Sequence, residues 1–258
     1  MIYIGLDMGM SAVKAVLINE DGIIGSHSRL TEEESETAAR HMRDHVLQAN
    51  GLAEADVVMV AATGMGRKEV SFAGVKRTEQ VCLARGAGFL FPTVKTVLDT
   101  GAGGCRALRL GDGGKLLDFA LNSKCAGGTG SFIEAAGRVL QIDLERLDQM
   151  AMEAETPARV SSYCAVFAES EIISNIHRGF PMAAICAGIC ESIMQRMLDV
   201  MRRVGTRRDV LLCGGVARNR TIVEMFNAQL DTAVMVPEEP VMVGALGAAL
   251  IGRDLAQS

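Results

Sequence analysis

The stretch IYIGLDMGMSAVKAVLI, residues 2–18, decides the fold. Its first apolar residues, 2–6, are typical of a buried strand that ends at Asp7. A second β-rich run follows at residues 12–18, and the segment between the two runs contains Gly9, which favours a tight turn. The pattern predicts a hairpin whose first strand ends in a carboxylate on a glycine turn.

The same theme returns about 90 residues further along the chain. An apolar run leads to Asp99, the glycine-rich residues 101–104 follow, and residues 106–110 are typical of a returning strand. Two such units at this separation indicate a duplicated fold. A third glycine turn, at Gly214 and Gly215, follows another apolar run.

Helical segments are expected between and after these turns. Thr31 and the glutamates that follow it are typical of a helix N-terminus, and Gly51 is typical of its end. A further strand is expected at residues 57–62. The other expected helices are 80–88, 131–140, 142–152, a long region 165–203 that is interrupted at 179–181, and 244–255.

Composition sets the class of protein. The 258 residues are 49% hydrophobic and 22% charged, which is typical of a folded globular chain. A net charge of −5 and the lack of Trp provide neither a basic field nor many stacking platforms, so we expect no nucleic-acid partner. The longest apolar run, residues 241–252, is too short to span a bilayer, and residues 1–5 carry no basic leader. We therefore expect a soluble, cytoplasmic protein without a membrane partner.

Asp7 and Asp99 are the catalytic candidates. A carboxylate at a strand end can bind Mg²⁺ or its water while the N–H groups of a glycine turn hold phosphate oxygens. One such turn alone is more often a plain hairpin, but two of them with a third glycine turn favour a nucleotide site. The candidate cofactor-binding residues are Gly9, Ser11, Ala12 and Lys14 in the first loop, Gly101, Gly103 and Gly104 in the second, and Gly214, Gly215 and Asn219 in the third.

Two cysteines are candidate metal ligands. Seven cysteines at irregular spacing indicate reduced thiols rather than a disulfide framework. Cys125 and Cys164 each precede a predicted helix, whose N-terminus would lower the thiol pKa and favour a thiolate; a small buried core residue is the alternative for each. A [4Fe–4S] cluster needs four thiolates. Two chains would supply them, which would place the cluster at a dimer interface.

The rival ligand set lies within one chain and adds Cys186 and Cys190. These residues are four apart on one helix face, but their apolar surroundings favour a core position. The remaining cysteines, Cys82, Cys105 and Cys213, are interpreted as structural. The four histidines, His27, His41, His45 and His177, are interpreted as unaccompanied surface or helix residues.

The two carboxylate turns, together with the third glycine turn, resemble the actin, hexokinase and Hsp70 ATPase superfamily over almost the whole chain. The resemblance implies an α/β fold of two duplicated ribonuclease-H-like halves with a nucleotide cleft between them. The first half would be residues 1–92, joined by the C-terminal helix 238–258. The second half, residues 93–237, would carry the cluster cysteines.

Four motifs extend the resemblance to one family: CAGGTGSF from Cys125, SSYCAVFAESE over residues 161–171, ATGMGR over 62–67 and GGVARN over 214–219. They resemble the iron–sulfur ATPases that activate 2-hydroxyacyl-CoA dehydratases and the ATPase subunits of ATP-dependent benzoyl-CoA reductase. In that family one [4Fe–4S] cluster bridges two subunits, and ATP drives a low-potential electron to a partner. The resemblance implies that Cys125 and Cys164 bind the cluster, and that Asp7 and Asp99 handle ATP with Mg²⁺. It also implies a second ATPase chain, identical or homologous, a reductase or dehydratase as electron acceptor, and ferredoxin or flavodoxin as donor.

The chain departs from the dehydratase activators in both phosphate loops. Those activators tend to have Gly-Ser-Thr in the first loop, where this chain has Gly9-Met-Ser-Ala-Val-Lys14. In the second loop they tend to have Asp-Ile-Gly-Gly-Gln-Asp, where this chain has Asp99-Thr-Gly-Ala-Gly-Gly-Cys-Arg106 and so lacks the Gln-Asp pair that bears on hydrolysis. The Ala-Val-Lys sequence resembles the smaller ATPase subunit of benzoyl-CoA reductase and favours that role. The alternatives are a homodimeric activator of a dehydratase or of a related double-cubane-cluster protein, a small-molecule kinase, and a nucleotide-sensing module.

Overall fold

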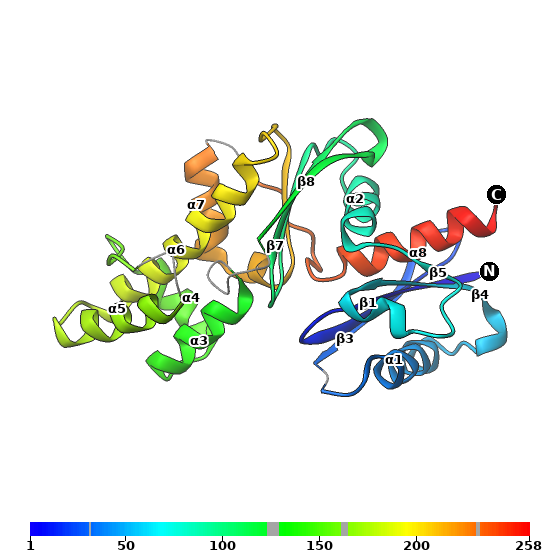
Figure 1. Ribbon diagram of the computed structural model, residues 1–258, viewed down its shortest axis with the longest axis horizontal. Coiled ribbons are helices and arrows are strands. Elements are labelled where there is room, and N and C mark those ends of the chain that lie inside the picture. Colours follow the sequence, from blue (N-terminus) through cyan, green and yellow to red (C-terminus); the bar gives the residue numbers. More distant parts are fainter. Residues whose placement is uncertain (31, 123–128, 161–164, 231–232) are drawn as a thin grey trace. The chain divides into compact units, whose positions relative to one another are not determined.

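A computed structural model of the chain describes residues 1–30, 32–122, 129–160, 165–230 and 233–258 (Figure 1). The chain divides into two compact units. Unit 1 comprises Met1–Val94, Leu110–Leu117 and Val241–Ser258, and unit 2 comprises Lys95–Arg109 and Asp118–Pro240.

Unit 1 has a five-stranded sheet in the order β3-β2-β1-β4-β5. β1 pairs antiparallel with β2 and parallel with β4, which confirms the predicted hairpin at the start of the chain. The strands are β1 (Ile2–Met8), β2 (Ala12–Ile18), β3 (Ile23–Leu30), β4 (Val57–Gly64) and β5 (Val75–Lys76). The helices are α1 (Ser35–Ala49), α2 (Glu79–Leu90) and α8 (Val243–Ala256), with 3₁₀ turns over Glu54–Asp56, Met65–Glu69 and Asp112–Gly114.

Alternation of side chains along β1 separates the two faces of this sheet. Ile4 belongs to the core on one face, together with Met42 of α1. Tyr3 belongs to the core on the other face, together with Leu246 of α8. Asp7 has the same parity as Tyr3. The strand that fills one core with its even-numbered residues therefore presents the carboxylate on the face that α8 covers.

Helix α8 packs closely against β1 and α2 because glycines line the contacts. A Cβ on Gly5 would overlap the carbonyl oxygen of Ala245, and a Cβ on Gly247 would overlap the carbonyl oxygen of Cys82. Gly244 lies on the same helix, but a Cβ there would meet only ordinary contacts, the nearest at 3.6 Å. The two helical glycines therefore differ in what an added methyl group would cost.

We expect Gly247→Ala to lower the free energy of unfolding by about 1–3 kcal/mol, because the backbone of α2 must move to admit the methyl group. Gly244→Ala is the matched control. It should leave the stability unchanged or raise it, since alanine has the higher helix propensity. Urea unfolding of both variants measures the difference, and equal stabilities would contradict close packing at Gly247.

Unit 2 contains most of a four-stranded sheet in the order β8-β7-β6-β9. Its strands are β6 (Thr96–Thr100), β7 (Cys105–Leu110), β8 (Leu116–Asn122) and β9 (Val210–Cys213), and its helices are α3 (Gly130–Leu140), α4 (Leu144–Met152), α5 (Ala165–His177), α6 (Met182–Arg202) and α7 (Arg220–Leu230). α6 forms the centre of the core, where Ile185, Ile189 and Ile193 are fully buried. Among the described residues, no helix has the length and apolar character needed to cross a membrane.

Four strands and helices are not predicted by the amino-acid pattern: β3, β5, β8 and α7. β3 is an edge strand with mostly exposed side chains, so no apolar run marks it.

The expected start of the first helix is also wrong. α1 begins at Ser35, after the N-cap Glu34, while Thr31 lies outside the described residues. Glu36 fixes this start by accepting hydrogen bonds from the backbone N–H and the hydroxyl of Ser71, at 2.7 and 2.6 Å.

His27 of β3 and His45 of α1 form a ring pair, with centroids 4.1 Å apart. Burial, and then the neighbouring His45, lower the pKa of His27 below 6.5. As pH falls through 6.5, the unfolded chain binds a proton at His27 that the folded chain does not, so the free energy of unfolding decreases. We expect the melting temperature to fall less between pH 7 and pH 5 in His27→Gln than in the wild-type chain. An equal fall in both would contradict this assignment.

Candidate nucleotide-binding loops

The first loop is closed by a backbone hydrogen bond and an ion pair. The N–H of Gly9 donates to the carbonyl oxygen of Ala12 at 3.1 Å. Asp7 and Lys14 face each other across β1 and β2, with Lys14 Nζ 3.2 Å from Asp7 Oδ2. A Cβ on Gly9 would lie 2.7 Å from this Nζ, so glycine leaves the space that the ammonium group occupies. Ser11, at the loop's tip, is half-buried.

Asp7 also lies beside the first turn of α8. A Cβ on Gly244 in that turn would be 3.6 Å from Asp7 Oδ2. The positive end of the helix dipole favours a negative charge at this place. The Asp7 side chain is 15% exposed, so the carboxylate is held by its neighbours and still open to a ligand.

Asp99, at the start of the second loop, is held through both of its carboxylate oxygens by side chains of the neighbouring strands β7 and β9. Arg106 Nη1 donates to Oδ2 at 2.6 Å, and the thiol of Cys213 lies 3.8 Å from Oδ1 and donates to it. The N–H of Gly101 donates to the carbonyl oxygen of Gly104 at 3.0 Å and closes the turn. Gly103 is exposed at the tip of the loop.

The third turn contacts the second. Gly214 has a φ of +82°, and a Cβ there would overlap the carbonyl oxygen of Thr100 and lie 2.8 Å from Asp99 Oδ1. Gly215 is exposed, with open space where a Cβ would point. Asn219, the third candidate of this turn, is buried and caps α7, because its Oδ1 accepts the N–H of Ile222 at 2.8 Å. Asn219 therefore has a structural role as a helix cap, and its contact with a nucleotide stays a prediction.

The second loop is joined to the N-terminus of α3. The N–H groups of Gly130 and Ser131 donate to the carbonyl oxygens of Gly101 and Ala102, at 2.9 and 3.2 Å. The hydroxyl of Ser131 also donates to the Ala102 carbonyl oxygen, at 2.8 Å. Movement of this loop would therefore be transmitted directly to α3.

The two predicted cluster ligands, Cys125 and Cys164, lie outside the described residues. The five described cysteines are free and buried, as expected for core positions: Cys82, Cys105, Cys186, Cys190 and Cys213. Burial raises the pKa of Cys105 to about 12 and that of Cys186 to about 11. In the absence of a metal ion, Cys105 and Cys186 are therefore expected to be protonated at neutral pH.

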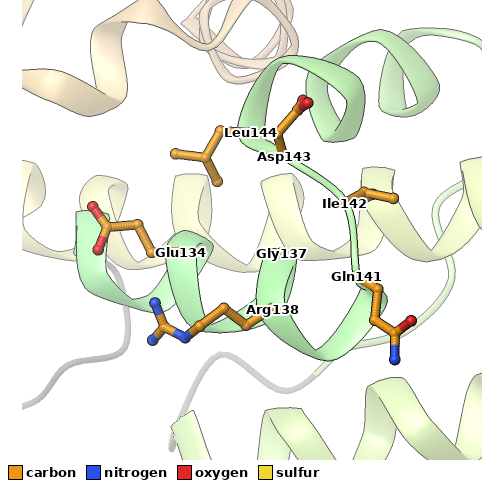
Figure 2. Close-up of a pocket in the computed structure, with 7 residues that line it drawn as sticks. All are labelled: Glu134, Gly137, Arg138, Gln141, Ile142, Asp143 and Leu144. Carbon is orange, nitrogen blue, oxygen red and sulfur yellow. The ribbon is translucent and has the colours of Figure 1, made fainter.

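The described residues contain no group of three or more His, Cys, Asp or Glu side chains arranged to bind a metal ion. Asp7 and Asp99 each supply a single carboxylate, a ligand that magnesium accepts together with phosphate oxygens rather than in an all-protein cage. A surface pocket of about 420 Å³ lies where α3 ends and α4 begins (Figure 2). It is lined by Glu134, Gly137, Arg138, Gln141, Ile142, Asp143 and Leu144, and it includes none of the predicted site residues.

The residues missed by sequence reasoning are Arg106 and Cys213, the two partners of Asp99. Arg106 had a detectable signal. It follows Asp99 by the same seven residues that separate Lys14 from Asp7. Cys213 comes from β9, whose parallel pairing with β6 no local spacing reveals.

Two α/β units, each with a carboxylate on a glycine turn, are the architecture expected of the actin, hexokinase and Hsp70 fold. A glucokinase from Streptomyces griseus shares the fold, with a TM-score of 0.59 at 13% identity, covering 98% of this chain and 100% of the kinase chain. This confirms the expected fold class. Within it, the chain belongs to the BadF/BadG/BcrA/BcrD ATPase family, whose model matches residues 4–252.

Several relatives in this family have functional names. The activator of 2-hydroxyisocaproyl-CoA dehydratase from Clostridium difficile, solved with bound ADPNP, is 35% identical with a TM-score of 0.93, covering 100% of this chain and 96% of that chain. A benzoyl-CoA reductase subunit from Thauera aromatica is 33% identical over 263 residues, covering 97% of this chain and 93% of the relative. Both branches of the predicted family, the dehydratase activators and the benzoyl-CoA reductase subunits, are thereby confirmed as relatives.

Proposed function

We propose that the chain is an ATP-driven electron donor that activates a 2-hydroxyacyl-CoA dehydratase. Cys125 and Cys164 of two chains would bind one [4Fe–4S] cluster, and Asp7 and Asp99 would bind Mg-ATP. The cluster supplies a one-electron carrier. Its electron passes to an iron–sulfur component of the dehydratase and is replaced from ferredoxin or flavodoxin, while ATP is hydrolysed to ADP and phosphate.

The observation that carries this proposal is the hydrogen-bonded junction of Gly101 and Ala102 with Gly130 and Ser131. It ties a candidate phosphate loop to the helix that follows the Cys125 segment. A change of about 60 mV in a one-electron potential requires about 1.4 kcal/mol, so electron transfer at low potential needs a source of free energy, and this junction would link the cluster to nucleotide chemistry. α3 also packs against α5, the helix that follows Cys164.

The exposed side of α5 supports a contact with a second chain. Phe167, Ile173 and Ile176 are 68%, 41% and 39% exposed, although all three are large and apolar. Ile173 and Ile176 are three residues apart and therefore adjoin each other on the helix surface, and adjoining exposed apolar side chains are typical of a protein interface. The helix begins directly after Cys164, where a cluster shared between two chains requires a subunit contact.

The second candidate is an ATPase subunit of a benzoyl-CoA reductase. The Ala12-Val13-Lys14 sequence favours it, and Lys14 is the residue that pairs with Asp7. In that case the second chain would be homologous rather than identical.

Anaerobic reconstitution with iron and sulfide tests the proposal. We expect a brown dimer with one [4Fe–4S] cluster per two chains, which reduces a dehydratase component in the presence of ATP. Transfer to a benzoyl-CoA reductase component alone would favour the second candidate. A colourless monomer after reconstitution would overturn both, and phosphoryl transfer to a small molecule without iron would instead identify a kinase.

The junction itself predicts an uncoupled variant. Ser131→Ala removes one hydrogen bond between α3 and the second loop, so we expect the electrons delivered per ATP to fall by about threefold or more while ADP affinity changes by less than about twofold. Ser131→Thr keeps the hydroxyl and is the matched control. Stopped-flow reduction of the acceptor, with ATP turnover measured in parallel, gives the ratio. Full coupling in Ser131→Ala would contradict the role of this junction.

A further inference from the structure

Each of the two units contains an ion pair at the same place in its sheet. In each, the carboxylate near the end of the first strand lies opposite a basic residue on the antiparallel neighbour: Asp7 opposite Lys14, and Asp99 opposite Arg106. Both pairs are formed, with N–O distances of 3.2 and 2.6 Å. The register of the antiparallel strands thus places each basic residue directly opposite its carboxylate.

The second pair is the more enclosed. The side chains of Arg106 and Asp99 are 17% and 11% exposed, and the second oxygen of Asp99 faces the Cys213 thiol. A guanidinium group keeps its charge at any physiological pH and holds a carboxylate through directed N–H groups. Asp99 is therefore neutralised and fixed in one orientation.

Neutralisation matters because a nucleotide brings several negative charges. If a nucleotide binds at the second loop, the Asp99 carboxylate without its cation would repel the phosphate oxygens. The repulsion is strongest in a partly buried site. A divalent cation could bind the same carboxylate and cancel the same charge. Arg106 and such a cation would then be alternative partners of Asp99.

We infer that Arg106 is a positioning residue that neutralises Asp99 when no divalent cation is bound, and thereby sets how strongly nucleotide binding depends on Mg²⁺. The inference rests on the ATP-binding part of the proposed function and is independent of the iron–sulfur cluster. Arg106 acts through Asp99. If Arg106 instead contacted the phosphate directly, its loss would weaken nucleotide binding both with and without Mg²⁺, and also when Asp99 is replaced by asparagine.

Calorimetric titration of the full chain with ADP, in EDTA and in excess MgCl₂, separates these roles. We expect Arg106→Gln to weaken ADP binding by about tenfold or more in EDTA and by less than about threefold in Mg²⁺. Arg106→Lys should restore most of the affinity in EDTA. Arg109→Gln is the matched control, because it removes the same charge from the same strand, where Arg109 pairs only loosely with Asp118 at 3.7 Å.

A second comparison uses the double variant Asp99→Asn with Arg106→Gln and the single variant Asp99→Asn, and it serves also if Arg106→Gln alone is unstable. With the carboxylate removed, the loss of Arg106 should no longer weaken binding in EDTA relative to Asp99→Asn alone. Equal losses in both buffers, or a loss that persists in the Asp99→Asn background, would overturn the inference. A wild-type chain that binds no ADP in either buffer would overturn the nucleotide-binding function and the inference with it.

Discussion

Replacing Cys125 with alanine abolishes iron binding after anaerobic reconstitution while ADP affinity stays within about twofold of the wild-type value. The loss is large because each chain supplies only two of the four thiolates that a [4Fe–4S] cluster needs. Removing one ligand per chain leaves two for the whole dimer. Iron content, the visible spectrum and ADP titration measure the two properties separately.

Cys186→Ala is the matched control for that variant. Cys186 is fully buried in α6, so its loss should lower the stability without removing iron. The same amount of iron in Cys125→Ala as in the wild-type chain would refute the ligand assignment. Loss of iron from Cys186→Ala in a folded chain would instead favour the ligand set within one chain.

Replacing Asp7 with asparagine lowers ATP turnover by about a hundredfold or more and leaves the iron content unchanged. A carboxylate that binds Mg²⁺ contributes several kcal/mol of charge stabilisation, and the amide oxygen of asparagine carries no net charge. The variant also leaves Lys14 without its partner at 3.2 Å. Steady-state phosphate release measures turnover.

Asp21→Asn is the control for the Asp7 variant. It removes a charge from the exposed turn after β2, far along the strand from the Asp7 loop, and should leave turnover within about twofold. Turnover in Asp7→Asn that equals that of Asp21→Asn would reject Asp7 as part of the nucleotide site.

The sequence was most informative where a buried strand meets a glycine. The apolar run before Asp7 and the nearby Gly9 predict the hairpin without tertiary information, and the same reasoning holds around Asp99. It was least informative for β3, because an edge strand with exposed side chains needs no apolar pattern. Asn219 shows a different limit. A capping asparagine and a ligand-binding one look alike until the N–H of Ile222 is located.

Partners of Asp99 show why the chemistry of a site is harder to predict than its position. Arg106 could have been recognised from the repeated spacing, since the register of an antiparallel pair is local. The thiol of Cys213 reaches Asp99 from a strand more than a hundred residues away in sequence. Only the parallel pairing of β6 with β9 brings the two together.

Unit 1 is completed by a segment that is synthesised only after unit 2. Its N-terminal sheet leaves the ribosome early, yet α8, which covers Tyr3, Val16 and Ile18, follows only after all of unit 2. During translation the nascent hairpin therefore has one apolar side uncovered, a condition that favours aggregation or chaperone capture. Completion of unit 1 therefore waits for a helix that follows β1 by roughly 240 residues in sequence.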